Sequence, residues 1–220
     1  MLDDTGATTR PVAPSRPVDA SVRYLLLADI SGYTAFLAGV EETHGVDFSG
    51  GIPAGFSIIG ALLDSVVDGV QPAFDVSKLE GDAVFATAPA ADLDGRGAAV
   101  LERLRSVERA FREVQRRQAL EASDHVCSAC PRAASLSLKM LLHRGSAVTV
   151  ERGGQLEIHG AAVNAVHRLL KNSVRTRIGP QPYILITDAA ATSLHVDEGI
   201  PHDENYDDIG VVSGRIIAVE

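Results

Sequence analysis

The sequence predicts an α+β fold in which helices pack against a mainly antiparallel sheet, and three observations support this prediction. The apolar run of residues 24–28 stops abruptly at Asp29, which is typical of a buried strand that ends at a turn. Apolar side chains at helical spacing in residues 58–70 predict an amphipathic helix that covers one face of the sheet. Residues 78–86 contain two short apolar runs separated by Glu-Gly-Asp, the pattern of a tight β-hairpin.

The rest of the chain continues the alternation of helices and strands. A long surface helix is expected from Gly97 to about Ala122, because its apolar side chains form one stripe and charged side chains fill the other faces. Its arginines could form a phosphate patch, but we favour a solvated helix face. The remaining expected elements are strands at 135–142, 147–150 and 155–158, a helix at 163–174, a strand at 183–187, a short helix from Asp188, an acidic loop at 203–208 and a closing strand at 211–219. This order suits a ferredoxin-like βαββαβ arrangement.

Composition and charge limit the classes of function. The chain has 220 residues, 45% of them hydrophobic, which suits one domain with a substantial core. Its formal net charge of -9 gives no general attraction to nucleic acid or anionic lipid, so we expect a small-molecule ligand and no nucleic-acid partner. No apolar stretch approaches the roughly 20 residues that span a bilayer, and the N-terminus lacks a secretory signal pattern. We therefore expect a soluble cytoplasmic protein without a membrane anchor.

The domain organisation follows from where the apolar residues begin. Residues 1–19 are rich in proline and threonine and have little to bury, so we expect a flexible tail. Residues 20–220 carry the expected helices and strands and form one predicted domain. Two cysteines, Cys127 and Cys130, are too few for a disulfide framework and are consistent with a reducing compartment.

One acid ends the first strand and another lies in the turn of the hairpin, and the fold should bring the two together. A right-handed crossover places the return strand of the hairpin beside the first strand, so that Asp29 lies next to Asp82. Two adjacent carboxylates repel each other unless a divalent cation lies between them, and hard cations such as magnesium prefer oxygen ligands. The alternative is that each acid is separately solvated. We interpret the pair as a magnesium-phosphate site.

These motifs resemble those of a known family, the class III nucleotidyl cyclase catalytic domain. Residues 29–34, Asp-Ile-Ser-Gly-Tyr-Thr, are similar to its first metal motif, and residues 78–86 are similar to its Lys-x-x-Gly-Asp motif. The likeness covers most of the chain. It implies that Asp29, Asp82 and the backbone carbonyl of Ile30 hold two Mg²⁺ or Mn²⁺ ions, which activate the ribose 3'-hydroxyl and grip the triphosphate. The implied reaction converts ATP to 3',5'-cyclic AMP and pyrophosphate.

A second pair of candidate residues lies in the predicted helix at 163–174. Asn164 and Arg168 are four positions apart, so they project from the same face of a helix. The resemblance implies that Asn164 orients the ribose and that Arg168 stabilises charge on the reacting phosphate, as preorganised donors do in many active sites. The alternative is a polar pair on the surface of the helix.

A third pair concerns the choice of base. The resemblance implies that Lys78 and Glu157 occupy the positions that read the base edge in adenylate cyclases. An acceptor for an exocyclic amine together with a donor for a ring nitrogen is the pattern that adenine requires. A cross-strand ion pair between Lys78 and Glu157 is the alternative interpretation.

The resemblance also implies an assembly. It predicts a head-to-tail homodimer in which Asp29 and Asp82 of one subunit face four residues of the other: Lys78, Glu157, Asn164 and Arg168. The function would then depend on the assembly.

Three departures from the family pattern bear on activity. Ala161 stands where an acid is common, Glu157 is longer than the usual aspartate, and the closing strand lacks the lysine expected to grip the triphosphate, with Arg215 four positions late. They suggest a divergent bacterial cyclase-like subfamily. A module that binds a nucleotide or a protein partner without catalysis is therefore the alternative function.

A further motif departs from the family as an insertion near residues 123–133. His125, Cys127 and Cys130 would supply three ligands of a zinc site, but the chain has no second Cys-x-x-Cys to complete it. A histidine such as His143, or a dimer partner, could supply the fourth ligand. We favour a reduced structural loop over a zinc site.

Overall fold

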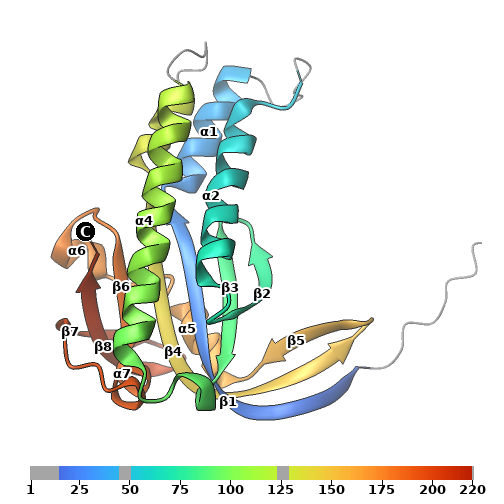
Figure 1. The fold of residues 1–220 in the computed structure, drawn as a ribbon, viewed down its shortest axis with the longest axis vertical. Helices are drawn as coiled ribbons and strands as arrows, with labels where there is room; N and C mark the ends of the chain where they lie inside the picture. The colour runs from blue at the N-terminus through green and yellow to red at the C-terminus, as the bar shows by residue number, and fades with distance from the viewer. Residues whose placement is uncertain (1–14, 45–50, 123–128, 220) are drawn as a thin grey trace, which may run out of the picture.

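The computed structural model describes residues 15–44, 51–122 and 129–219 (Figure 1). The elements follow one another as β1 (Arg16–Ser31), α1 (Tyr33–His44), α2 (Ala54–Val70), β2 (Asp75–Glu80), β3 (Ala83–Pro89), α3 (Ala90–Leu93), α4 (Gly97–Glu121), the 3-10 helix η2 (Cys130–Ser135), β4 (Ser137–Arg152), β5 (Gln155–His159), α5 (Ala161–Arg168), α6 (Val174–Ile178), β6 (Tyr183–Thr187), α7 (Asp188–Leu194), β7 (Ile200–Tyr206) and β8 (Gly210–Ala218).

The strands form one mixed sheet in the order β2-β3-β1-β4-β6-β8-β7, and β5 pairs with β4 outside this path. Among the described strands, β4 and β6 are parallel and the other neighbours are antiparallel. This confirms the predicted α+β class with a mainly antiparallel sheet. The return strand of the hairpin, β3, lies beside β1 as the crossover argument required, with Asp29 opposite Ala83.

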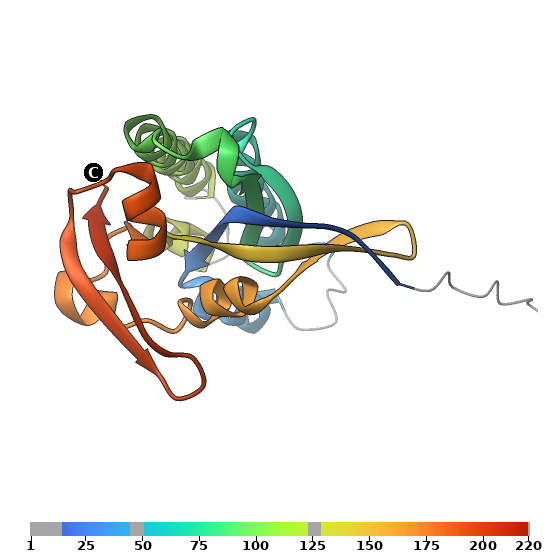
Figure 2. The ribbon, with the colours of Figure 1, turned by 90° about the horizontal axis from the view of Figure 1, so that it is seen from below.

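Helices α2 and α4 cover one face of the sheet (Figures 1 and 2). Both helices carry an apolar stripe, and Leu62 and Val66 of α2 and Leu104 and Val107 of α4 are fully buried with Leu26 of β1. Each such side chain stabilises the fold by about 1.5–3 kcal/mol relative to its exposed state. This larger core fixes the direction of β1 and therefore where its last residues end.

Helix α5 covers the opposite face of the sheet (Figure 2). Alternation along β1 sends Leu25 and Leu27 to this side, where they pack with Val166 of α5 in a second core. A Cβ atom on Gly145 of β4 would come within 2.6 Å of the Cβ of Ala162, so glycine at this position allows α5 to lie close to the sheet. Asp29 has the same parity as Leu25 and Leu27, and it therefore faces the side of the sheet that carries α5.

The N-terminal part of β1 corrects one expectation. Residues 16–19 were assigned to the flexible tail, but they belong to β1 and pair with the end of β4, where Arg16 lies 3.0 Å from Glu151. Residues 1–14 of the expected tail lie outside the described part of the chain. Strand β4 is also continuous through residues 143–145, where a break was expected. With β5, these long strands form an arm that projects from the body (Figure 1).

The helix expected at 163–174 is instead two short helices, α5 and α6. Asn172 lies at the break, where its Nδ2 donates to the carbonyl of Leu169 at 2.6 Å and its Oδ1 accepts from the backbone N–H of Val174 at 3.1 Å. The hydroxyl of Tyr183 donates to the same Oδ1 at 2.9 Å. A short polar side chain that bonds to the backbone in this way competes with helical hydrogen bonds, which explains the interruption.

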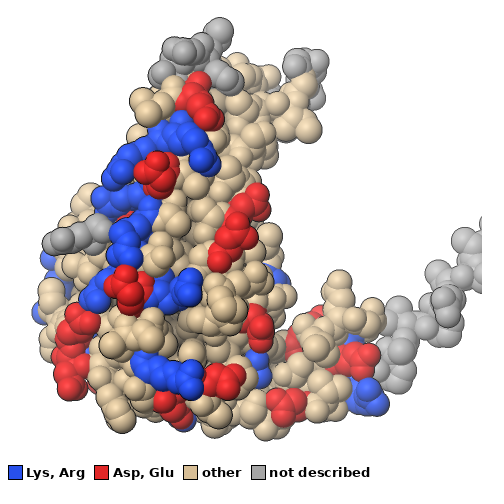
Figure 3. Space-filling view, in the orientation of Figure 1, with Lys and Arg blue, Asp and Glu red and all other residues tan. Residues whose placement is uncertain are grey.

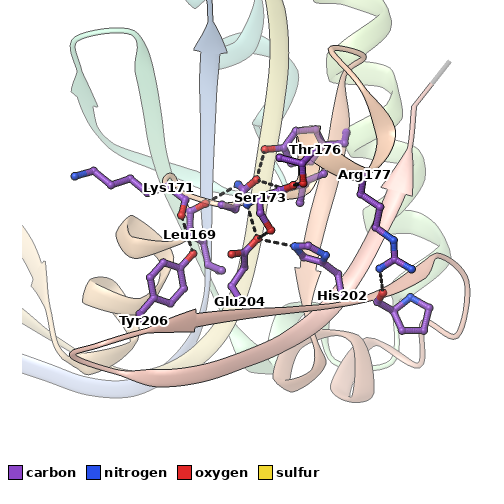
Figure 4. A network of polar contacts seen from close by, with 12 residues as sticks. Leu169, Lys171, Ser173, Thr176, Arg177, His202, Glu204 and Tyr206 are labelled. Atoms are coloured by element: carbon purple, nitrogen blue, oxygen red, sulfur yellow. Dashed lines mark hydrogen bonds and ion pairs between the residues drawn. The ribbon is translucent and has the colours of Figure 1, made fainter.

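The expected acidic loop at 203–208 is mostly strand β7, and this is a second correction. His202 and Glu204, two positions apart in this strand, point inward and are buried (Figure 4). The sequence suggested a loop because a run of polar residues gives no sign that alternate side chains are buried. Glu204 accepts hydrogen bonds from the backbone N–H and hydroxyl of Ser173 and lies 2.6 Å from Nε2 of His202. Burial opposes ionisation, but the bonds from Ser173 and His202 lower the pKa of Glu204. The network fixes the segment that follows α5.

Candidate functional site

The structure brings Asp29 and Asp82 together at the end of β1. The backbone N–H of Ile30 donates to the carbonyl of Asp82 at 3.1 Å, and Asp29 lies opposite Ala83, the next residue after Asp82. Burial and the charge of Asp29 raise the pKa of Asp82. Asp29 therefore opposes the ionisation of Asp82, and two half-buried carboxylates held together in this way form an environment that attracts a cation.

Lys139 of β4 completes this cluster, and the sequence analysis did not identify it. It lies directly across from Asp29 in the sheet, with its Nζ 3.1 Å from Oδ2 of Asp29 and 3.2 Å from the carbonyl of Leu170. The side chains of Lys139 and Asp29 are only 17% and 14% exposed. A lysine on the inward-facing side of an apolar strand was the signal that could have identified it.

The oxygen atoms near Asp29 and Asp82 suit a hard cation only if substrate phosphates supply further ligands. Among the described residues no group of three or more His, Cys, Asp or Glu side chains could hold a metal ion. Asp29, Asp82 and the Ile30 carbonyl nevertheless offer oxygen ligands at one strand end. Magnesium usually binds through one or two carboxylates together with waters and substrate phosphates, so a pair of acids fits this chemistry.

The residues expected to read the base and ribose meet in one pocket of about 410 Å³. Lys78 of β2, Glu157 of β5 and Asn164 of α5 line it, although they come from three separate elements. Glu80 and His167 line the same pocket, and the sequence did not assign either of them to the base or the ribose. Neither Asp29 nor Asp82 is among its lining residues.

Glu80 organises one side of this pocket. It forms an ion pair with Lys78, and its Oε2 lies 2.9 Å from Nε2 of His167. Burial alone would raise the pKa of Glu80, but the bonds from Lys78 and His167 bring it below its ordinary value. The ring of Phe85 lies beneath both partners, with its centroid 5.7 Å from Nζ of Lys78 and 5.2 Å from the centroid of the His167 ring.

Glu157 has different partners from those considered for it. Its Oε2 lies 3.1 Å from Nε of Arg152 and 3.0 Å from Nε2 of His159, both on the arm. Lys78 pairs with Glu80, so the alternative of an ion pair between Lys78 and Glu157 is wrong in this structure. Glu157 is held in the pocket by donors from β4 and its own strand.

Asn164 and Arg168 separate, although they lie on the same helix. Asn164 is exposed at the pocket, whereas Arg168 turns towards the β7–β8 turn, where its Nε donates to Oδ2 of Asp208 at 2.7 Å. Both members of this pair are about half exposed, at 50% and 47%. Arg215 is also occupied and donates to the carbonyl of Asp197 at 3.0 Å.

Three other sequence-based expectations can be compared with the structure. The arginines of α4 alternate with acids along an exposed face, with Arg105 2.9 Å from Glu198 and Arg109 2.6 Å from Glu102, which confirms a solvated face rather than a phosphate patch (Figure 3). His125 and Cys127 of the possible zinc site lie outside the described residues, and Cys130 is buried in η2. The described helices are too short or too polar to span a lipid bilayer.

Solved structures with the same fold are nucleotidyl cyclases. The guanylyl cyclase Cya2 matches with a TM-score of 0.65 and 13% identity, over 93% of this chain and 96% of that chain. The adenylyl cyclase CyaB from P. aeruginosa matches with a TM-score of 0.58 and 14% identity, over 94% and 97%. The catalytic core of a rhodopsin-guanylyl cyclase in complex with ATPαS matches with a TM-score of 0.57 and 13% identity, over 94% and 100%. At these identities the likeness shows the fold, which is that of a class III cyclase catalytic domain.

Sequence comparison gives the family. The curated Uncharacterized protein Rv2561/Rv2562 of Mycobacterium tuberculosis (strain ATCC 25618 / H37Rv) is 31% identical over 163 residues, which is 71% of this chain and 71% of that protein. A family model described as protein of unknown function (DUF2652) matches residues 59–177, which include the hairpin with Asp82, strands β4 and β5 of the arm, and helix α5. The chain therefore belongs to the DUF2652 family and has the fold of a class III nucleotidyl cyclase catalytic domain.

Proposed function

We propose that the protein is a nucleotidyl cyclase that converts ATP to 3',5'-cyclic AMP and pyrophosphate. The observation that carries this proposal is the placement of Asp29 and Asp82 side by side at the end of β1, where the charge of Asp29 acts on Asp82. The likeness in fold to adenylyl and guanylyl cyclases supports it. The pocket formed by Lys78, Glu157 and Asn164 would take the base and ribose.

Asp29, Asp82 and the Ile30 carbonyl would hold Mg²⁺ or Mn²⁺, two ions per site as the resemblance implies. Bound there, such ions supply Lewis-acid activation of the 3'-hydroxyl and neutralise charge on the triphosphate. Lys139 would contribute a fixed positive charge beside Asp29. The closing strand lacks the lysine expected to grip the triphosphate, and Lys139 would take its place. Its ammonium group is already held beside the carboxylates, where the phosphate oxygens would bind.

Two chain groups would act on the nucleotide from the pocket, and Arg168 would act on it from outside the pocket. Glu157 would accept a hydrogen bond from the exocyclic amine of the base, and Asn164 would orient the ribose. Arg168 would stabilise charge on the reacting phosphate once it leaves Asp208. That exchange is inexpensive, because an ion pair as exposed as Arg168 with Asp208 contributes only about 0–1 kcal/mol.

A head-to-tail homodimer would join the two halves of the site. Within one chain the carboxylate pair and the pocket are separate, since neither Asp29 nor Asp82 lines the pocket. A two-fold partner that presents its pocket to this carboxylate pair would complete two equivalent sites. The function would then require assembly.

Product formation tests the proposal directly. Purified protein would be incubated with Mn²⁺ and each of the four nucleoside triphosphates, and cyclic nucleotide would be quantified by chromatography. We expect cyclic AMP from ATP, and Asp82→Asn should lower its formation by at least about a hundredfold. Asp64→Asn, which removes an exposed acid of α2, is the matched control and should retain activity. Absence of any cyclic product from a folded dimer would reject catalysis.

A second candidate function is a module that binds a nucleotide without converting it. Three intrachain ion pairs favour it, because Lys78, Arg168 and Asp29 already have partners in Glu80, Asp208 and Lys139. Calorimetric titration with a non-hydrolysable ATP analogue separates the two candidates. Binding without product under the conditions above would support the module, whereas product would support the cyclase.

A further inference from the structure

A second hollow lies between the arm and the β2–β3 hairpin. It has a volume of about 530 Å³, within the range of small-molecule sites, and residues of β1, β2, β3, β4 and β5 line it. Ser77, Leu156 and Ile158 separate it from the pocket assigned to the base and ribose, because they line both. The side chains assigned to the nucleotide are not among its lining residues. We call this hollow the arm pocket.

Arg23 of β1 supplies the positive charge of the arm pocket. It is partly buried, and its Nε and Nη2 donate to Oγ1 of Thr87 at 3.4 and 3.1 Å. Thr87 is only 1% exposed, so it gives the guanidinium group a fixed anchor. Arg23 forms no ion pair with any residue in the described part of the chain. A guanidinium group has five N–H donors, so the anchor leaves others for a ligand.

Asp75 of β2 supplies a negative charge to the same hollow. It is exposed and lies directly opposite Thr87 in the hairpin. Like Arg23, it forms no ion pair within the part of the chain that the structure describes. The two opposite charges therefore flank one threonine, each within a side-chain length of it, without pairing with each other.

The arm adds apolar surface. Leu156 of β5 is 62% exposed, and Ile158 of the same strand and Val76 of β2 are partly buried. All three line the hollow, and their surface is accessible to a ligand. An apolar group that lies against Leu156 would remove apolar surface of both partners from water, which favours binding.

Charge selects a ligand that carries both signs. An anion such as a phosphate would be attracted by Arg23 but repelled by Asp75, and a cation would meet the reverse situation. A zwitterion satisfies both groups through charge-assisted hydrogen bonds. In an α-amino acid the carboxylate and the ammonium group are attached to the same carbon, which suits two partners that flank a single residue.

We propose that the arm pocket binds an α-amino acid with a large apolar side chain. Its carboxylate pairs with Arg23, its ammonium group pairs with Asp75, and its side chain lies against Leu156 and Ile158. This site is distinct from the proposed cyclase site and does not rest on the proposed function.

Three small molecules with the same ring test the proposal. L-phenylalanine carries both charges, 3-phenylpropionate lacks the ammonium group and 2-phenylethylamine lacks the carboxylate. Titration of the full chain, followed by ligand-observed NMR, should show saturable binding of L-phenylalanine in the millimolar range or tighter. Each of the other two should bind at least about tenfold more weakly, since each leaves one charged group unpaired. The readout is binding, so failure here leaves the cyclase proposal untouched.

Two substitutions should change the order of these probes in opposite ways. In Arg23→Gln, L-phenylalanine should bind at least about tenfold more weakly and 2-phenylethylamine should bind as tightly as before or more tightly, because the repelling cation is gone. In Asp75→Asn, L-phenylalanine should again lose affinity, whereas 3-phenylpropionate should gain it. Arg117→Gln on α4 and Asp68→Asn on α2 remove the same charges from exposed positions and should keep the wild-type order.

A further variant keeps the test decisive if Arg23→Gln does not fold. Leu156→Ser removes an exposed apolar side chain and should weaken L-phenylalanine binding, whereas Val211→Ser removes a similarly exposed side chain from β8 and should leave it unchanged. No saturable binding of L-phenylalanine by the wild-type protein would overturn the proposal. So would equal affinities for the three probes, or an unchanged order of affinities in folded Asp75→Asn.

Discussion

His167 and Glu80 join helix α5 to the β2–β3 hairpin, although they are 87 residues apart in the chain. Nε2 of His167 lies 2.9 Å from Oε2 of Glu80, and Nδ1 lies 2.8 Å from the carbonyl of Val163. Both ring nitrogens therefore face acceptors. Glu80 also pairs with Lys78, so one carboxylate links the helix that carries Asn164 to the strand that carries Lys78.

The first prediction concerns the stability of this link. Glu80→Gln should lower the free energy of unfolding by about 1 kcal/mol at neutral pH, because it weakens two charge-assisted hydrogen bonds of a side chain that is 28% exposed. Urea unfolding measures the difference. Glu102→Gln removes an exposed partner of Arg109 and should cost less. A smaller loss for Glu80→Gln than for Glu102→Gln would contradict the role of the link.

The pH dependence of that difference follows from the pKa of Glu80. Although burial raises it, Lys78 and His167 bring the folded-state pKa below the ordinary value of 4.5. A carboxyl with a lowered pKa contributes stability that is fully present above the unfolded-state pKa and is lost as pH falls through the folded-state pKa. The gap between wild type and Glu80→Gln should thus be full at neutral pH and shrink below pH 4.5. A gap that widens on acidification would have the wrong sign.

The second prediction separates the two acids of the proposed metal site. Burial and Asp29 raise the pKa of Asp82, so ionisation of this carboxyl is less favourable in the folded chain than in the unfolded chain. Asp82→Asn should therefore keep or increase the free energy of unfolding, and the gain should vanish at low pH, where the wild-type acid is protonated. Asp29→Asn should instead destabilise by about 1–3 kcal/mol, because it leaves the half-buried Lys139 without its carboxylate.

Both variants should lose cyclase activity, so their stabilities provide the contrast. Denaturant titrations at neutral and acidic pH, together with product assays on the same preparations, check it. Equal stability of the two variants would show that Lys139 does not depend on Asp29. Retained turnover in either variant would remove the two-carboxylate interpretation.

The third prediction concerns assembly. Inactive Asp82→Ala mixed with inactive Arg168→Ala should regain activity, because a heterodimer of the proposed kind contains one site with both groups intact. Random exchange makes about half of the dimers mixed, each with one of two sites, so recovery should approach about a quarter of the wild-type rate. Subunit exchange would be followed by native mass spectrometry. No recovery despite proven exchange would argue for sites completed within one chain.

The sequence predicts some residue pairs of the site and not others, according to whether local patterns or long-range packing bring the two residues together. The placement of Asp29 beside Asp82 followed from a strand, a crossover and a hairpin, which are local patterns with a fixed handedness. The pair of Lys139 with Asp29 depends on the register between β1 and β4, which a sequence pattern does not specify. The pair of Glu80 with His167 depends on where α5 crosses the sheet.

The break between α5 and α6 shows a different limit. Apolar spacing continues through Leu169, Leu170 and Val174, so periodicity predicts one helix. The helix ends because Asn172 bonds the backbone and Ser173 is held by Glu204 of a distant strand. A tertiary contact therefore decided an element boundary, and Arg168, at the end of α5, turned to Asp208 rather than to the pocket.

The fourth prediction concerns base selection, which we assign to Glu157. Its carboxylate would accept a hydrogen bond from the amine of adenine but would face the O6 acceptor of guanine with repulsion. Arg152 and His159 hold it from the arm, at 3.1 and 3.0 Å, so it is positioned before a nucleotide arrives. Leaving a buried polar group unpaired costs about 1–3 kcal/mol, which corresponds to roughly tenfold to hundredfold discrimination against GTP.

Glu157→Ala should flatten this preference, with kcat/KM for ATP falling while that for GTP stays level or improves. Glu151→Ala is the matched control, because it also removes a carboxylate from the arm. Glu151 pairs with Arg16 and does not line the pocket. Steady-state kinetics with both nucleotides would be measured for the three proteins. Lys78 is held by Glu80 rather than by Glu157, so Glu157→Ala should leave Lys78 in place. Any change in the ratio of kcat/KM for ATP to kcat/KM for GTP then reports the role of Glu157 itself. A wild-type preference for GTP, or an unchanged ratio in Glu157→Ala, would show that Glu157 does not read the base.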